Sequence, residues 1–362
     1  MRVTIGIALL VAAALVRFVG VPFACRLPEG FASSQQLIGE YQTLDPATFD
    51  LGTPTAVAAK RDTAVEQTDW ATAVIRSTTV LDLPSGPLTS EYRYAVDRAD
   101  YGQSRAPSGA RVQDQLGGMV ISRPIGAGKD SFKVYNPVLD KTQRMKFTGA
   151  SEIQGREAYG FSGTATGLVA DHQLLVPYQS AIADMAKTGD GTTIPKLLLE
   201  MIAPNLPARY SAGLKAVLPE LPNEVPIGFT IDDTTSMTLD KQLGAPITLA
   251  AEQTTILNVF VDLELVPVLP LSKLALHSTD QSAAEAARFM ADSGRKLTVF
   301  RTYLPIVLAS AALTILAIAA AIRSTGRRRA GRSAPDIEIA AADPLLGQPV
   351  RAQHELLEPQ RR

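Results

Sequence analysis

The amino-acid sequence predicts an α+β fold, in which a β-rich extracytoplasmic domain lies between an N-terminal and a C-terminal transmembrane helix. Three observations predict this arrangement. Residues 303–322 form one uncharged, largely apolar stretch, a second apolar stretch covers most of residues 3–24, and short β-type segments fill much of the chain between them. Gly, Pro and Asp turns separate these segments at roughly 8–12-residue spacing, which favours a curled or barrel-like antiparallel sheet with a short helical insert.

The composition excludes several functional classes. The chain has 362 residues and a formal net charge of −1, so no overall field favours nucleic acid or another polyanion as a partner. Cys25 is the single cysteine of this sequence, which excludes an internal disulfide and a metal site built from clustered cysteines.

Residues 1–25 are expected to form an N-terminal transmembrane anchor. Arg17 interrupts the apolar run, and an anchor accommodates it by directing its side chain towards the headgroup layer. A cleaved signal peptide and a lipoprotein signal at Cys25 are the alternatives. Pro22 and Phe23 suit neither cleavage pattern, so the uncleaved anchor is favoured, while cleavage and lipidation of Cys25 remain open.

Residues 26–278 are expected to form the extracytoplasmic, periplasmic domain. Trp70–Leu83 and Ser90–Gly102 alternate polar and apolar residues and are rich in strand-forming types, and similar segments continue to about Gly167. Strand patterns resume after the helical insert. Ser236–Thr255 is predicted to be a hairpin with its turn near Gly244.

The helical insert is expected at about residues 177–220. Proline starts a first helix at Pro177 and a second at Pro195, and Pro207 and Pro219 bound a third. The second helix is predicted to place four apolar residues on one face, namely Leu197, Leu198, Met201 and Ile202. This insert is either a lid over an apolar interior or ordinary core packing, and core packing is favoured.

The C-terminal part is predicted to be a juxtamembrane helix over residues 279–302, a transmembrane helix over 303–322 and a basic, disordered tail over 323–362. Thr279 or Asp280 can cap the first helix, and Gly294 predicts a kink or break in it. About 20 apolar residues suffice to cross a bilayer, and basic residues behind a span stay cytoplasmic. The topology determinants are Arg323, Arg327, Arg328, Arg329 and Arg332. We therefore expect a plasma (inner) membrane protein with two spans, both termini cytoplasmic and the bulk of the chain outside.

No catalytic, metal or cofactor site is expected. The three histidines lack a metal-ligand spacing, and Gly160–Gly163 resembles a nucleophile elbow without its final glycine. Asp232 and Asp233 would point to opposite faces of a strand and cannot act as a couple. The sequence therefore predicts a protein that is not an enzyme.

Several segments carry a family resemblance. They are residues 39–63, 69–86 (DWATAVIRSTTVLDLPSG), 135–165 and the 236–247 hairpin (SMTLDKQLGAPI), placed between the two apolar stretches. Together they resemble the actinobacterial domain-of-unknown-function family catalogued as PorA-type porins, over about residues 1–325. The resemblance implies a cell-envelope membrane protein with a periplasmic domain. The family includes a mycobacterial polar growth factor, linked to trafficking of trehalose monomycolate with the flippase that exports it.

The functional hypothesis is a non-enzymatic envelope protein whose periplasmic domain binds or escorts a long-chain, mycolate-type lipid and supports lipid trafficking and polar growth. The resemblance implies as partners membrane lipids such as trehalose monomycolate and an envelope lipid transporter. The alternatives are a scaffolding protein that binds other proteins and a porin, as the family name suggests. The candidate lipid-binding residues are Leu197, Leu198, Met201, Ile202 and Phe260.

Overall fold

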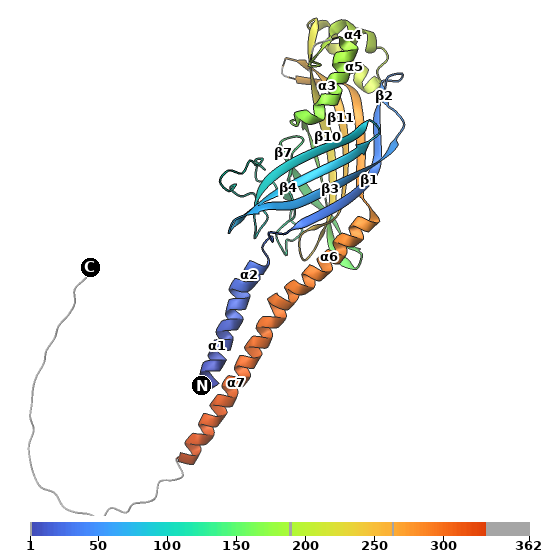
Figure 1. Ribbon diagram of the computed structural model, residues 1–362. Coiled ribbons are helices and arrows are strands. Elements are labelled where there is room, and N and C mark those ends of the chain that lie inside the picture. Colours follow the sequence, from blue (N-terminus) through green and yellow to red (C-terminus); the bar gives the residue numbers. More distant parts are fainter. Residues whose placement is uncertain (1, 188–189, 263, 331–362) are drawn as a thin grey trace, which may run out of the picture.

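A large antiparallel sheet forms the body of the protein, and long helices leave it at one end (Figure 1). The computed structural model describes residues 2–187, 190–262 and 264–330. The twelve-stranded sheet has the order β5-β4-β3-β1-β12-β11-β10-β8-β7-β6, with β2 paired to β1 and β9 paired to β10. The α+β class and the antiparallel sheet are thus confirmed. The sheet is curled but open, because its edge strands β5 and β6 do not pair with each other.

The strands are β1 (Ala32–Asp45), β2 (Asp50–Leu51), β3 (Thr55–Thr68), β4 (Thr72–Leu83), β5 (Gly86–Asp97), β6 (Phe132–Asn136), β7 (Lys141–Ile153), β8 (Arg156–Leu168), β9 (Thr193–Pro195), β10 (Glu224–Asp240), β11 (Pro246–Val261) and β12 (Glu264–Ser278). The helices are α1 (Arg2–Leu15), α2 (Val21–Ala24), α3 (His172–Ala186), α4 (Lys196–Ile202), α5 (Ala208–Val217), α6 (Asp280–Thr298) and α7 (Leu304–Ala330). Two π-helical turns, η1 (Val16–Gly20) and η3 (Val299–Tyr303), and one 3-10 turn, η2 (Leu218–Glu220), complete them.

The connection between the two edge strands fills the gap in the sheet. We call residues 98–131 the edge segment. Its Gln113 N–H donates to Arg93 O on β5 (2.8 Å), and its Met119 N–H donates to Lys133 O on β6 (2.9 Å). Because an unpaired edge exposes backbone donors and acceptors, these bonds protect both edges without a continuous strand.

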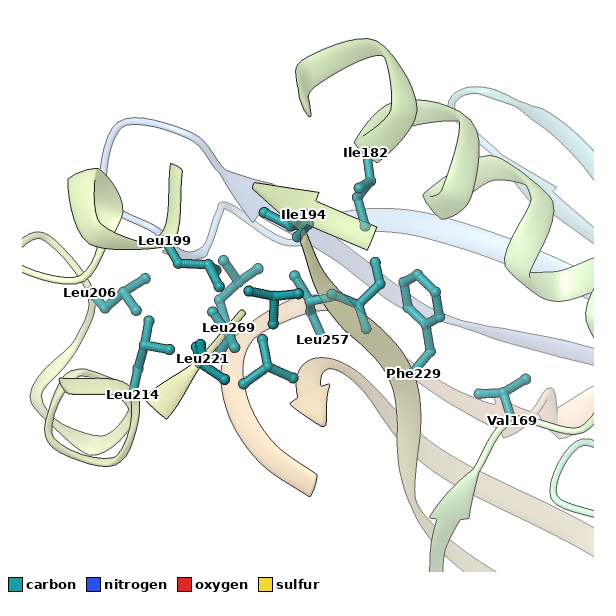
Figure 2. Packing of buried hydrophobic residues seen from close by; sticks show 14 of the residues in the cluster. Val169, Ile182, Ile194, Leu199, Leu206, Leu214, Leu221, Phe229, Leu257 and Leu269 are labelled. Atoms are coloured by element: carbon teal, nitrogen blue, oxygen red, sulfur yellow. The ribbon is translucent and has the colours of Figure 1, made fainter. Parts of the chain in front are cut away.

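The main hydrophobic core lies at the end of the sheet farthest from α6 and α7 (Figures 1 and 2). There α3, α4 and α5 cover the sheet, and Ile194, Leu199 and Leu214 are almost completely buried. Leu257 and Phe229 supply the sheet side of the same cluster. The insert therefore packs as part of a core, the favoured interpretation.

The insert differs from the sequence prediction at its first helix. Asp171 caps α3 by accepting from Gln173 N–H (3.0 Å), so the helix begins at His172 and contains Pro177. The helix begins here because the Asp171 carboxylate caps its first N–H groups. Pro177 is tolerated in the second turn because it removes only one backbone hydrogen bond. The starts behind Pro195 and Pro207 are confirmed.

The C-terminal helices form one continuous rod, α6–η3–α7 (Figure 1). The Thr279 cap is confirmed, since its side chain accepts from Ser282 N–H. The predicted break at Gly294 is wrong, because Gly294 is buried against the sheet and α6 continues to Thr298. The predicted disordered tail is wrong over residues 323–330, which continue α7, while Arg332 and the rest from 331 onward lie outside the described residues.

One helix among the described residues, Asp280–Arg323, is long and apolar enough to cross a membrane. The apolar part of the N-terminal helix, Ile7–Gly20, is shorter, so an N-terminal span stays a prediction. α1 lies beside α7, and the π-helical turns η1 and η3 are in contact with each other. The N-terminal helix therefore accompanies the long rod.

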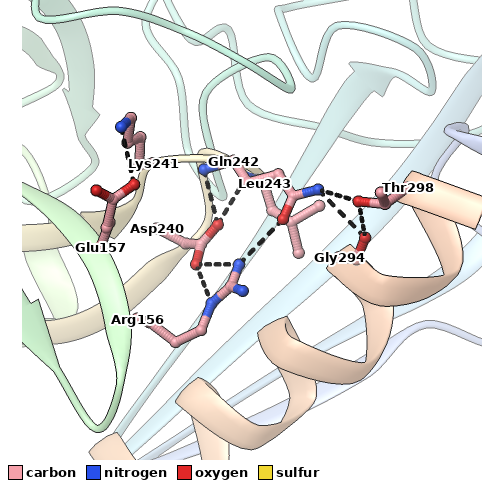
Figure 3. A network of polar contacts seen from close by, with 8 residues as sticks. All are labelled: Arg156, Glu157, Asp240, Lys241, Gln242, Leu243, Gly294 and Thr298. Atoms are coloured by element: carbon pink, nitrogen blue, oxygen red, sulfur yellow. Dashed lines mark hydrogen bonds and ion pairs between the residues drawn. The ribbon is translucent and has the colours of Figure 1, made fainter. Parts of the chain in front are cut away.

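A polar network joins the sheet to the rod (Figure 3). The buried carboxylate of Asp240 forms an ion pair with Arg156 (2.7 Å) and accepts from the N–H groups of Gln242 and Leu243. Gln242 Nε2 in turn donates to Gly294 O (3.2 Å) and to Thr298 Oγ1. A Cβ at Gly294 would lie 2.5 Å from Gln242 Oε1, so any other residue here would displace the Gln242 side chain from its place. We call this network the Asp240 clamp.

We expect Asp240→Ala to lower the free energy of unfolding by about 3–5 kcal/mol, because it leaves Arg156 without its partner and frees two turn N–H groups. Chemical denaturation of the detergent-solubilised full chain measures this effect. Glu157→Gln is the matched control, since it removes an exposed ion pair with Lys241 from the same turns and should leave the unfolding curve unchanged. Equal curves for both variants would contradict a structural role for the clamp.

Candidate binding cavity

A partly open cavity of about 330 Å³ lies between the two halves of the curled sheet. Its wall comes from both halves of the sheet and from the edge segment. The strand residues in the wall are Gln35, Leu37, Arg61, Ser77, Thr79, Leu81, Leu88, Ser90, Tyr92, Tyr94, Phe132, Val134, Tyr135, Asn136, Gln143, Asp233, Thr235, Met237, Leu239, Pro246, Leu249, Ala251, Gln253, Leu274 and Leu276. Residues 119–123, Pro137, Val138 and Leu174 complete it.

The cavity begins where the main core ends. On β10, the inward positions up to Ile231 belong to the core, and those from Asp233 to Leu239 face the cavity. On β12, Leu269 belongs to the core and Leu276 to the cavity. Since β12 leads directly into α6, the cavity occupies the half of the sheet next to the rod.

Leucines make one wall of the cavity apolar. Leu37 and Leu81 are buried, and Leu88, Leu249 and Leu276 pack against them. They come from β1, β4, β5, β11 and β12, so the wall forms only when the sheet curls. Such a surface is suited to a hydrocarbon chain.

Asp233 on β10 places an acid in the cavity wall. It accepts hydrogen bonds from Gln253 Nε2 (2.9 Å), Thr235 Oγ1 (3.0 Å) and Asn136 Nδ2 (3.3 Å). Burial raises the pKa of this carboxyl above its usual range, against the effect of these donors. The opposite-face prediction for the acidic pair is confirmed, because Asp232 is exposed on the other side and accepts from Thr166.

Two arginines also line the cavity. Arg61 on β3 donates through Nε to Ser77 Oγ (3.1 Å). Arg123 in the edge segment lies over the rings of Phe132 (4.6 Å) and Phe161 (5.1 Å) and donates to Gly128 O. Burial lowers the pKa of both guanidinium groups, which nevertheless stay charged at neutral pH.

A surface groove adjoins the cavity at the seam between β5 and β6. Tyr92 and Tyr135 line both the groove and the cavity, and four acidic residues border the groove, namely Glu91, Asp114, Asp140 and Asp171. The Tyr92 hydroxyl donates to Asp171 Oδ2 (2.6 Å), which ties edge strand β5 to the start of α3. Burial, together with this bond to Asp171, raises the pKa of Tyr92, so the phenol stays a donor at neutral pH.

The five predicted lipid-binding residues lie outside the cavity wall. Leu198 and Ile202 pack against the main core, whereas Leu197 and Met201 are 66% and 58% exposed. The face of α4 that carries these four residues is therefore buried on one side only, because α4 turns Leu199 inward and exposes two of the four. The fifth, Phe260 on β11, lies over Gly228 of the neighbouring strand. Their binding to lipid stays a prediction.

The topology arginines fall at the far end of the rod. Arg323, Arg327, Arg328 and Arg329 are part of α7, which ends at Ala330. Within the described residues, no group of three or more His, Cys, Asp or Glu side chains is arranged to hold a metal ion. The cavity is therefore the candidate binding site of the described residues.

The sequence did not predict that Arg61, Arg123 and Tyr92 line a cavity. One signal for the cavity exists on β10, where the inward positions change from Phe229 and Ile231 to Asp233 and Thr235. A buried strand face that turns polar indicates that it no longer packs in a core. Nothing comparable marks Arg123, because the edge segment has no regular period.

The fold and the cavity define a class of protein: an antiparallel sheet with an amphipathic internal pocket, carried on a long apolar helix. The chain belongs to the Porin PorA family, whose model matches residues 1–321. This membership confirms the family resemblance of the sequence.

Other comparisons add little. No curated protein matches the chain. Among solved structures, the chain is similar to an acyl-CoA thioesterase II TesB2 from Mycobacterium marinum, at 9% identity over 68% of this chain and 80% of that chain, with a TM-score of 0.12. It is also similar to a tesB protein of Mycobacterium avium subs paratuberculosis, at 11% identity over 74% and 85%, with a TM-score of 0.10. TM-scores this low support no inference about fold or activity.

We expect Tyr92→Phe to loosen the seam, because it removes a hydrogen bond to a charged group worth about 1.5–3 kcal/mol. Hydrogen exchange should quicken in β5 and at the start of α3. Tyr135→Phe is the control, since its bond to Asp140 (2.7 Å) joins residues five apart and spans no edge. Unchanged exchange in β5 and α3 of the Tyr92 variant would contradict a closing role for this bond.

Proposed function

We propose that the protein is a non-enzymatic, membrane-tethered binder of a long-chain lipid, and that the cavity holds the lipid's acyl chain. The observation that carries this proposal is the apolar wall inside the pocket next to the rod, which consists of Leu37, Leu81, Leu88, Leu249 and Leu276. An apolar wall of this kind excludes water and is stabilised by an apolar ligand. This site replaces the residues of α4 as the favoured lipid contact.

The volume limits the ligand. Pockets for small ligands span about 300–1,000 Å³, and this cavity lies near the lower end. It fits one chain, or the end of one, rather than a complete two-chain lipid. A mycolate-type lipid would keep part of its hydrocarbon outside, which suits a role in escorting a lipid to an envelope transporter.

A two-span orientation fits the same proposal. The N-terminal helix lies beside α7 and ends next to the turn between β3 and β4. At that place Arg26 lies over the Trp70 ring (4.2 Å) and near the Phe23 ring (5.5 Å), and both aromatic side chains are exposed. Aromatic residues with a basic partner are typical of the bilayer interface. We infer that this end of the sheet touches the membrane of the cell envelope, with both termini in the cytoplasm.

A scaffolding role is the second candidate. It is favoured by exposed apolar side chains at the opposite end of the sheet, where Leu197 and Met201 on α4 stand beside solvent. Such residues can anchor a protein partner. A partner bound there would leave the cavity unused, so the two functions are separable by experiment.

Filling the cavity tests the lipid proposal. Ala251 lies in the cavity wall, and we expect Ala251→Phe to reduce the lipid that co-purifies with the full-length protein about tenfold or more, as measured by mass spectrometry. Ala250→Phe is the matched control, because the neighbouring residue of β11 points to the other face of the sheet. Equal lipid content in wild type and Ala251→Phe would overturn the proposal.

The single tryptophan, Trp70, tests the orientation. In nanodiscs, its fluorescence should be quenched by lipids brominated near the headgroup and protected from aqueous iodide, because the proposed orientation puts its side chain at the interface. Trp70→Phe supplies the background signal. Full quenching by iodide with no effect of brominated lipid would show that this end of the sheet stands clear of the membrane.

A further inference from the structure

The positive charges in the cavity wall form no ion pair. Arg61 and Arg123 are the two basic residues of the wall, and within the described part of the chain neither forms an ion pair with an acid. The charge of Asp130, which lies outside the wall, only opposes the lowering of the Arg123 pKa by burial. Asp233 is the one acid in the wall, and neutral side chains from four residues engage its carboxyl. The wall itself therefore carries an excess of one positive charge.

One buried donor in the same wall lacks an acceptor. It is Nε of Arg123, a residue 7% exposed. Gln143, a residue 3% exposed, lies beside Asp233 and helps to hold down the pKa of that carboxyl, so its amide faces an acid of the chain itself. Buried polar groups in proteins are paired in about nine cases of ten, so an orphan arginine donor lining a cavity indicates an acceptor supplied from outside the chain.

The direction of this donor is fixed by the packing around it. Arg123 is stacked on Phe132 and Phe161, and its Nη1 donates to Gly128 O, so its guanidinium has a defined direction. The two phenylalanines come from β6 and β8, whereas the leucines of the wall come from β1, β4, β5, β11 and β12. The guanidinium therefore packs against other strands than the leucine wall.

We propose that the ligand of this cavity is an amphiphile with one anionic group, a carboxylate or a phosphate monoester, which Arg123 binds while its chain lies on the leucines. Arg61 adds a second positive charge to the same cavity. This inference rests on the proposed function, because it names the class of lipid that the cavity takes. The inference predicts that the cavity binds an acidic lipid more tightly than a neutral glycolipid of equal chain length.

The test compares an acid with its neutral ester. Wild-type full-length protein in phosphatidylcholine nanodiscs is titrated with radiolabelled palmitate and with methyl palmitate, and Ala251→Phe gives the background from the bilayer. We expect palmitate to bind about tenfold tighter or more, since hydrogen bonds to a charged group are roughly twice as strong as neutral ones. Hexadecyl phosphate then distinguishes a phosphate from a carboxylate ligand.

Two variants test whether Arg123 causes the preference for the acid over the ester. Arg123→Gln should lower palmitate affinity to that of the ester and leave the ester unchanged, whereas Arg111→Gln, an exposed arginine of the same segment, should change neither. The wild-type comparison stands even where Arg123→Gln fails to fold. Equal affinity of acid and ester overturns this inference and leaves the lipid function intact. Binding of neither ligand above the Ala251→Phe background overturns the proposed function itself.

Discussion

The carboxylate of Asp240 is the interaction on which the arrangement of the molecule depends. It closes the turn between β10 and β11 through two backbone N–H groups, and it neutralises Arg156 of the neighbouring strand. The turn that it shapes contacts α6 through Gln242 and the edge segment through Gly244, whose carbonyl accepts from Arg123 N–H. A Cβ at Gly244 would lie 2.6 Å from Arg123 O, so this contact requires glycine. One buried acid therefore connects the rod, the sheet and the wall of the cavity.

The two halves of the sheet are covered in different ways, although the same strands run through both. Far from the rod, its concave side is filled by α3, α4 and α5, which bury a large apolar cluster. Near the rod, no helix covers that side among the described residues, and the edge segment closes it instead. A loop fills space less completely than a helix, and the cavity lies at this end. The solid core gives the sheet its stability, which allows the other half to remain open to a ligand.

Local signals in the sequence predicted local structure well. The turn at Gly244, the cap at Thr279 and the helix starts behind Pro195 and Pro207 are set by neighbouring residues, and each was predictable. β1 and β3 were not, because their Ala, Gln and Lys residues show little alternation and their pairing with distant strands holds them. The cavity was not predictable for the same reason, because its wall joins residues from Gln35 to Leu276. Leu197 and Met201 were predicted as binding residues, but they lie outside the cavity because α4 is short and only one side of it is covered.

The unbroken passage from α6 into α7 has a mechanical consequence. The Asp240 clamp fixes α6 to the sheet, and the helix continues through Gly294 and the π-helical turn η3 into α7. Where α7 crosses a bilayer, the sheet cannot rotate freely relative to the rod, so a change in the tilt of the rod also tilts the sheet. A thinner or thicker bilayer alters that tilt. The height and angle at which the cavity faces the lipid surface are then set by the thickness of the membrane that holds the rod.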